Sequence, residues 1–163
     1  MSSRMRHSDS QKGWFGRDDE LVTAVLNVLC DCYGRETQHA MRYRQHAERI
    51  HHPEFRQELL NIAAEEQKHA ESVGRLIESL GGRIPEVVPV HIPKEQNLWL
   101  YLRTDLEEEE RCAEELRDDL LLVLDKSPEI SRLLNQIDED CKRHWLRIRA
   151  MLADSNPLSP GPP

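Results

Sequence analysis

The chain has 163 residues and a formal net charge of −8, and charged residues make up 32% of it. This length suits one domain with a core of its own. The acidic balance argues against nucleic-acid binding, which needs a basic face or stripe, and it favours cations as ligands. The longest apolar run, Leu120–Leu124, is far too short to span a bilayer.

Residues 1–17 are polar and contain no apolar stretch of the kind found in secretory signals. Four cysteines without such a signal are typical of reduced thiols rather than of a disulfide framework. We therefore expect a cytoplasmic protein that binds neither a membrane nor nucleic acid. We also expect residues 1–17 to be a flexible segment.

The first helix is predicted from about Asp18 to Ile50, because apolar residues recur there at the three-or-four spacing of one helix face. A break follows at His51-His52-Pro53, since proline disfavours helix in the residue before it and suits the first turn of the next helix. The inward face of this helix is predicted to hold Val22, Val25, Leu29, Cys32, Glu36, His39, Tyr43, Ala47 and Ile50.

The second helix is predicted to run from Pro53 to about Leu80 and to end at Gly81-Gly82, a typical C-terminal signal. Its inward face mixes apolar residues with Glu66 and His69. Residues 81–97 carry three prolines and are expected to be extended. At about 3.1 Å per residue, this connector is long enough to return along the whole bundle.

The third helix is predicted from about Leu98 to Asp125 and the fourth from Pro128 to about Ala153, after a second break at Ser127-Pro128. The sequence thus predicts an all-α four-helix bundle over residues 18–153, with two antiparallel hairpins joined by one long crossover, residues 81–97. The proline-rich tail, residues 154–163, is expected to be flexible.

Each predicted helix carries an ionisable or sulfur-containing group near the middle of its apolar face. Burial of one unpartnered carboxylate costs several kcal/mol, and three together repel one another. Protons or cations must therefore accompany them, and a divalent metal ion would do so most directly. The groups are Glu36, Glu66 with His69, Glu109 with Cys112, and Cys141 with His144.

Glu66 and His69 form an ExxH element, whose two side chains share one helix face and can reach one ion. Together with Ala64–Ala70, His52-Pro53-Glu54, Glu36-Thr37-Gln38 and Tyr43, it resembles the ferritin-like superfamily, especially rubrerythrin and bacterioferritin. Asp105-Leu106, Glu109, Ala113 and Leu116-Arg117 resemble the third helix of bacterioferritin. The resemblance spans roughly Leu21 to Leu152.

This resemblance implies a di-iron carboxylate site, with one glutamate from each of the first and third helices and an ExxH element from each of the other two. Glu36, Glu66, His69 and Glu109 match this pattern, and His144 matches it if Cys141 takes the place of the fourth glutamate, which bridges the two irons in the family. A thiolate suits zinc or copper better than a carboxylate does, so zinc is the alternative metal.

A second register of the fourth helix puts Glu139 at the ligand position and Lys142 in place of the second histidine. We prefer the first register, because Ile137, Cys141 and His144 share the apolar line of the helix and Glu139 falls on another face. Haem is not expected, because Gln67 stands where bacterioferritin has its haem-binding methionine.

Several other residues are interpreted as structural. His39, three residues after Glu36, could be an added ligand or a partner of a ligand, but we prefer to read it as a satisfied core histidine. We read Tyr43 as support for the site, and Trp99, Tyr101 and Trp145 as packing residues or subunit contacts. In the acidic run 107–110, only Glu109 lies on the inward line. The histidines read as surface or loop residues are His46, His51, His52 and His91.

The leading functional hypothesis is a metalloprotein that oxidises ferrous iron with oxygen or peroxide, for detoxification or storage, as an enzyme of the di-iron oxidoreductase type. Two alternatives stay open at this point: a non-catalytic bundle with a degenerate metal site that acts as a structural or partner-binding protein, and a zinc- or copper-binding bundle that uses its thiols. Ferritin-like chains commonly assemble, so a homo-oligomer of at least a dimer is expected.

Overall fold

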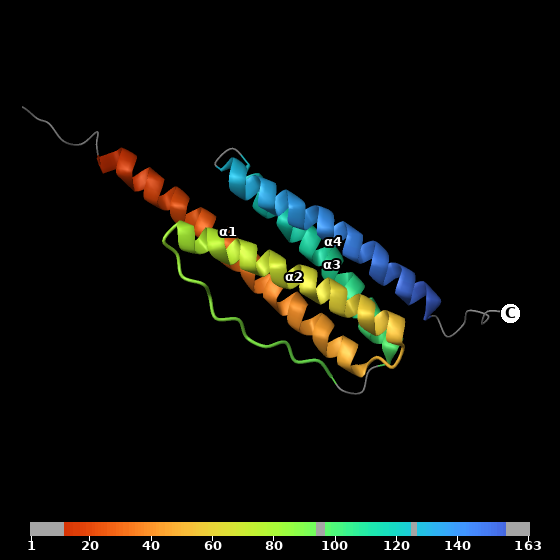
Figure 1. Cartoon of the computed structure of the whole chain (residues 1–163). Helices are drawn as coiled ribbons and strands as arrows, with labels where there is room; N and C mark the ends of the chain where they lie inside the picture. The colour runs from red at the N-terminus through yellow and green to blue at the C-terminus, as the bar shows by residue number, and fades with distance from the viewer. Residues whose placement is uncertain (1–11, 94–96, 125–126, 156–163) are drawn as a thin grey trace, which may run out of the picture.

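A computed structural model describes residues 12–93, 97–124 and 127–155, with side chains described from Asp19 onward. This part of the chain forms four long helices, α1 (Lys12–Arg49), α2 (Pro53–Ser79), α3 (Leu98–Val123) and α4 (Pro128–Asp154). They lie side by side in an elongated bundle (Figure 1). No strand occurs among the described residues, which confirms the predicted all-α four-helix bundle.

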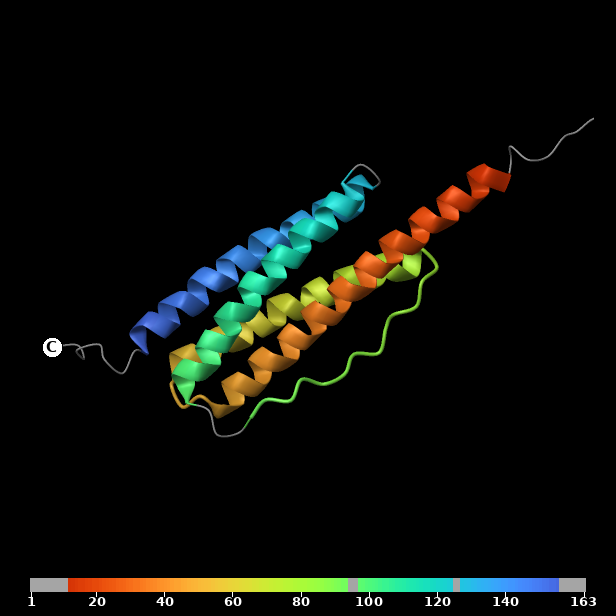
Figure 2. The same ribbon diagram turned by 180° about the vertical axis from the view of Figure 1, so that it is seen from behind.

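The helices pack as two hairpins, α1 with α2 and α3 with α4, and the hairpins meet through α1 with α3 and α2 with α4. The connector after α2 runs back along α1 for most of the length of the bundle, which the view from behind also shows (Figure 2). Side chains of α1 hold it there, because Gln45 Nε2 donates to Val90 O over 3.0 Å and Arg49 Nη1 donates to Ile92 O over 3.2 Å. The long crossover was predicted correctly.

Local sequence signals set the helix ends. Pro53 and Pro128 occupy the first turns of α2 and α4, where a missing N–H costs nothing. The side chain of Asn97 accepts a hydrogen bond from Leu100 N over 2.9 Å and caps α3. Gly81 follows α2 with a φ of +77°, a left-handed conformation that glycine adopts without strain.

Two apolar clusters fill the interior, one in each half of the bundle. One contains Leu29, Val73, Leu116 and Ile137, and the other contains Leu59, Ile62, Leu102 and Ile148. Between these two clusters lie Glu36 and His39 of α1, Glu66 and His69 of α2, Glu109 of α3 and His144 of α4. The polar layer is therefore enclosed by packed hydrocarbon at both ends.

The N-terminal part of α1 differs from the prediction. The helix begins at Lys12 instead of near Asp18, and its first turns extend past the ends of the other helices (Figure 1). Val22, predicted to point inward, is 42% exposed, because it lies near this uncovered end. Helix α3 ends at Val123 and α4 at Asp154, and most of the predicted flexible segments 1–17 and 154–163 lie outside the described residues.

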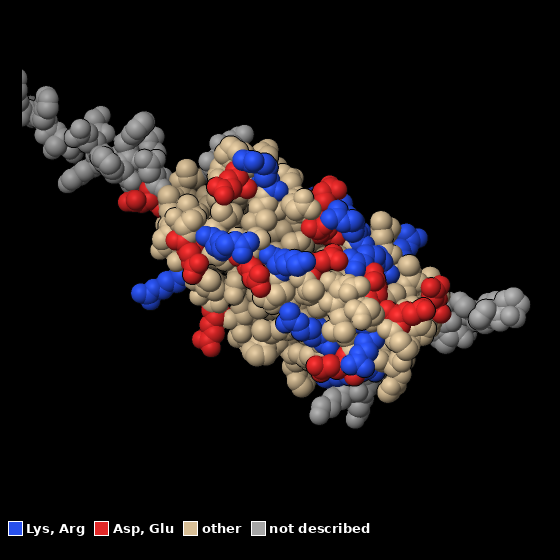
Figure 3. Space-filling model, viewed as in Figure 1, with Lys and Arg blue, Asp and Glu red and all other residues tan. Residues whose placement is uncertain are grey.

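The surface suits an aqueous environment on the face that Figure 3 shows, where acidic and basic side chains are interspersed. Within the described part of the chain, we find no helix with the length and apolar character needed to cross a bilayer.

Removal of a core side chain should cost far more stability than removal of an exposed one. Leu116 is completely buried in the first cluster, whereas Leu121, on the same helix, is 76% exposed. We expect Leu116→Ala to lower the free energy of unfolding by about 2–5 kcal/mol and Leu121→Ala to leave it nearly unchanged. Urea denaturation of both variants measures this, and equal losses would contradict the assigned core.

Candidate metal centre

The four helices bring every predicted ligand residue into one buried layer. Glu36 comes from α1, Glu66 and His69 from α2, Glu109 from α3, and Cys141 and His144 from α4. All six residues are at most 8% exposed. The inward helix positions inferred from periodicity therefore converge at mid-height of the bundle.

Two groups of donor atoms within this layer have the spacing of a metal site. The first group is Glu36, Glu66 and His69, which offer one donor atom each within 4.8 Å of one another. Its centre is His69 Nδ1, which lies 3.0 Å from Glu36 Oε2 and 3.3 Å from Glu66 Oε2.

The second group is His39, Glu66 and Glu109, within the same 4.8 Å limit. His144 borders it, because His144 Nδ1 lies 3.0 Å from Glu66 Oε1 and 3.7 Å from Glu109 Oε1. Glu66 belongs to both groups and presents a different oxygen to each of the two histidines His69 and His144. Its carboxylate therefore has the position of a bridge between two neighbouring sites.

Carboxylates outside the layer contact the Nε2 atoms of His69 and His144 and so orient the two rings. His69 Nε2 lies 2.9 Å from Asp140 Oδ2, and His144 Nε2 lies 2.9 Å from Glu65 Oε2. Each pairing leaves the Nδ1 atom directed at the glutamates. Histidines that bind metals are commonly held in this way through their second nitrogen.

These pairings are reciprocal between α2 and α4. Glu65 comes directly before Glu66, and Asp140 comes directly before Cys141. His69 of α2 contacts Asp140 of α4, and His144 of α4 contacts Glu65 of α2. The segment Asp140–His144 therefore repeats the geometry of the segment Glu65–His69. Cys141 thus stands at the place equivalent to Glu66.

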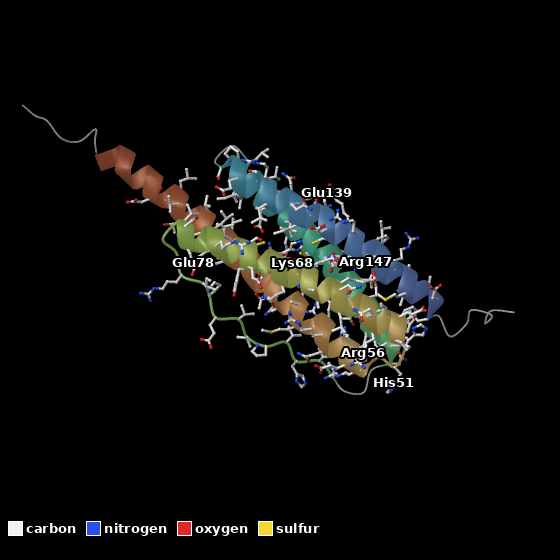
Figure 4. All side chains as sticks on the ribbon, viewed as in Figure 1. His51, Arg56, Lys68, Glu78, Glu139 and Arg147 are labelled. Carbon is white, nitrogen blue, oxygen red and sulfur yellow. The ribbon has the colours of Figure 1, made fainter. Side chains whose placement is uncertain are left out.

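The alternative register of α4 places its residues outside the layer. The side chain of Glu139 is 64% exposed and that of Lys142 is 52% exposed, and the two form an ion pair with each other at 3.3 Å. Figure 4 shows Glu139 on the outer side of α4. The geometry therefore favours the register with Cys141 and His144.

Cys141 contacts another thiol. Its Sγ lies 3.7 Å from Cys112 Sγ, and Cys112 Sγ lies 3.9 Å from Glu36 Oε1. Neither cysteine belongs to the two donor groups found among the described residues. The assignment of Cys141 as a ligand stays a prediction.

Unpartnered polar atoms show that the layer is built for an additional group. Both ring nitrogens of His39 and the Oε2 atom of Glu109 are buried without a hydrogen-bond partner. His39 Nδ1 lies 3.9 Å from Glu66 Oε1, which is too long for a hydrogen bond. Buried polar atoms are rarely left unpaired, and a cation between His39, Glu66 and Glu109 would satisfy one ring nitrogen of His39 and Oε2 of Glu109.

The protonation of the layer reflects its crowded carboxylates. Burial and repulsion from Glu66 raise the pKa of Glu109 to about 8, and the same two causes raise the pKa of Glu36 well above its usual value. Burial alone would lower the pKa of His39 and His69, but the adjacent carboxylates outweigh it and raise each pKa to about 10. Protons therefore supply the positive charge when no metal ion does.

Tyr43 and a histidine–aspartate pair border the layer on the side of the second apolar cluster. Tyr43 Oη donates to Glu109 Oε1, in agreement with its predicted supporting role. His46 was wrongly predicted to be at the surface: it is 1% exposed, and its Nδ1 lies 2.7 Å from Oδ2 of the buried Asp105. The other three histidines, His51, His52 and His91, are exposed as predicted.

Comparison with known proteins agrees with this architecture. The family model of rubrerythrin matches residues 27–152. The chain belongs to the rubrerythrin family. The fold of this rubrerythrin-family protein also matches the X-ray structure of bacterioferritin from Desulfovibrio desulfuricans, with a TM-score of 0.77 and 21% identity over 85% of this chain and 84% of the other. That structure is described as one of the diiron site in different catalytic states. No curated protein matches this family member in sequence.

The sequence of this rubrerythrin-family chain did not lead us to two contributors to the layer. Glu65 contacts His144 and Asp140 contacts His69, and the available signal was that these carboxylates directly precede positions 66 and 141. For His39, the satisfied core histidine was preferred to the added ligand, but neither of its ring nitrogens has a hydrogen-bond partner.

The raised pKa of Glu109 should make the metal-free protein less stable as the pH rises. The folded state holds the Glu109 proton more tightly than the unfolded chain, so this contribution is complete below pH 4.5 and disappears as the pH passes about 8. Between pH 5 and 8.5, roughly the window that these pKa values set, wild type should lose stability relative to Glu109→Gln. Urea denaturation with a chelator present measures this, with Glu139→Gln as the exposed control. Parallel profiles for wild type and Glu109→Gln would contradict it.

Proposed function

We propose that this protein binds two iron ions in the buried layer and oxidises ferrous iron with oxygen or peroxide, for detoxification or storage. The observation that supports this best is the pair of donor groups that share Glu66. The two groups supply carboxylates and imidazoles, which suit iron. The unpartnered atoms of His39 and Glu109 are the second support.

We assign Glu36, Glu66 and His69 to one ion, and Glu66, Glu109 and His144 to the other, with His39 as an additional ligand of the second ion. His39 would replace the donor that the family pattern places at position 141. Three carboxylates balance much of the charge of two divalent ions, so the binding of metal would relieve the repulsion that now holds protons in the layer.

The surrounding residues would orient the ligands and manage protons. Tyr43 donates a hydrogen bond to Oε1 of Glu109, so Oε2 of Glu109 would be free to bind the second ion. Asp140 and Glu65 fix the rings of His69 and His144, so their Nδ1 atoms point at the glutamates. Bound ferrous iron would supply the electrons for reduction of the oxidant. Protons displaced from the histidines on metal binding would pass to solvent or to the reduced form of the oxidant.

Substitution of the shared carboxylate should abolish binding of both ions. We expect Glu66→Gln to remove iron from the protein, whereas Glu139→Gln should bind it like wild type because Glu139 faces solvent. Anaerobic titration with ferrous iron, followed by elemental analysis, measures the stoichiometry. Equal loss in both variants would point to the alternative register of α4.

The additional ligand should affect one ion only. We expect His39→Ala to retain one tightly bound ion and to weaken the second by at least roughly 10- to 100-fold, the range seen even for groups that only support a ligand. His91→Ala, on the exposed crossover, serves as the matched control. Undiminished binding of two ions by His39→Ala would leave His39 as a core residue.

The same titration under air decides between the functional classes. Ferrous iron should be oxidised faster with wild type than with Glu66→Gln or with buffer. Bound metal without oxidation would favour sequestration, and zinc retained after purification with loss of zinc in Cys141→Ser would favour the thiol-containing zinc site. A protein that binds no metal would support the non-catalytic bundle.

A further inference from the structure

Cys112 and Cys141 form a buried pair of thiols across the α3–α4 interface. Each residue is 1% exposed, and their Sγ atoms are 3.7 Å apart. A disulfide requires about 2.05 Å between the sulfurs, so the two sulfurs would have to approach each other by less than about 2 Å to join. The two remaining cysteines, Cys30 and Cys32, are on α1.

A hollow between α3 and α4 extends from the surface to Cys141. Its volume is about 430 Å³, and Cys141 and Glu109 are among the residues that line it, together with Trp145, Leu146 and Lys142. A water molecule occupies roughly 30 Å³ in the liquid, so the hollow accommodates several molecules of that size. A small oxidant can therefore approach Cys141, while Cys112 lies behind it.

We propose that Cys112 and Cys141 are a redox-active dithiol that reduces hydrogen peroxide and becomes a disulfide between α3 and α4. This proposal does not depend on a bound metal ion. It combines two observations, the short distance between the sulfurs and the hollow that reaches one of them. The resulting bond would tie together two helices that carry ligands of the proposed metal centre.

The reaction balances with the two thiols as the only reductants. The sulfur of Cys141 attacks one oxygen of hydrogen peroxide and gives up its proton; the O–O bond breaks, and the departing hydroxide takes that proton to become water. Cys141 is then a sulfenic acid. Cys112 gives up its proton and attacks the sulfenic sulfur, the S–O bond breaks, and a second water leaves. Two electrons pass from the two thiols to one peroxide molecule.

The order of attack follows from access. Cys141 lines the hollow and Cys112 does not, so Cys141 meets the oxidant and Cys112 resolves the sulfenic acid. Because Cys112 Sγ donates to Glu36 Oε1 over 3.9 Å, formation of the disulfide would remove this S–H donor from a proposed metal ligand. The oxidation state of the pair would thereby affect the environment of Glu36.

The test uses the full chain, reduced, freed of reductant and kept with a chelator, then treated with one equivalent of hydrogen peroxide. We expect the loss of two of the four thiols and a mass lower by two hydrogen atoms. Peptide mapping after alkylation should find Cys112 joined to Cys141. No oxidation, oxygen added without a cross-link, or a cross-link that involves Cys30 or Cys32 would each overturn the proposal.

Single variants test the order of attack. Cys112→Ser should leave Cys141 as a sulfenic acid that dimedone traps, Cys141→Ser should protect Cys112, and Cys30→Ser should form the same disulfide as wild type. Trapping on Cys112 instead would overturn the assigned order. The mapped cross-link in wild type decides the main proposal even if a variant fails to fold. Since no metal is present, its failure is distinct from a failure of iron oxidation.

Discussion

The burial of three carboxylates in one layer is the constraint on which the rest of this structure depends. Glu36, Glu66 and Glu109 are each at most 1% exposed, and charges in such an interior require compensation close by. Histidines from α1, α2 and α4 surround them, and the raised pKa of His39 and His69, about 10 each, shows how strongly the layer attracts positive charge. The proposed metal ions would meet the same demand with fixed charges in place of protons.

The packing around the layer makes this arrangement possible. An apolar cluster on each side holds the helices at fixed separations. The extended crossover brings the start of α3 to the end of the bundle where α1 ends and α2 begins (Figure 1). Ion pairs then fix the relation of α2 to α4, since Arg147 of α4 contacts both Glu58 and Glu65 of α2. Arg147 lies between these helices in Figure 4.

The presence of Cys141 at the place equivalent to Glu66 divides the layer into two chemical regions. On one side, Glu66 is the carboxylate shared by both donor groups, and His39 stands with unpartnered nitrogens beside Glu66 and Glu109. On the other side, Cys141 and Cys112 form a thiol pair, and a hollow extends from the surface to Cys141. The ionic layer, which attracts cations, therefore adjoins an oxidisable pair of thiols. Glu36 belongs to the layer and also contacts the thiol of Cys112.

The sequence by itself determined the helices, their breaks at Pro53 and Pro128, the long crossover and the inward position of the three glutamates, because helical periodicity and proline act locally. It did not reveal the partners that lie across the bundle. His46 was misread because its partner Asp105 is on α3, and the contacts of His69 with Asp140 and of His144 with Glu65 exist only once α2 packs against α4. Only the tertiary structure decided which carboxylate meets which histidine and which thiols touch, because such pairings depend on the rotation and axial offset of neighbouring helices, which no single helix encodes.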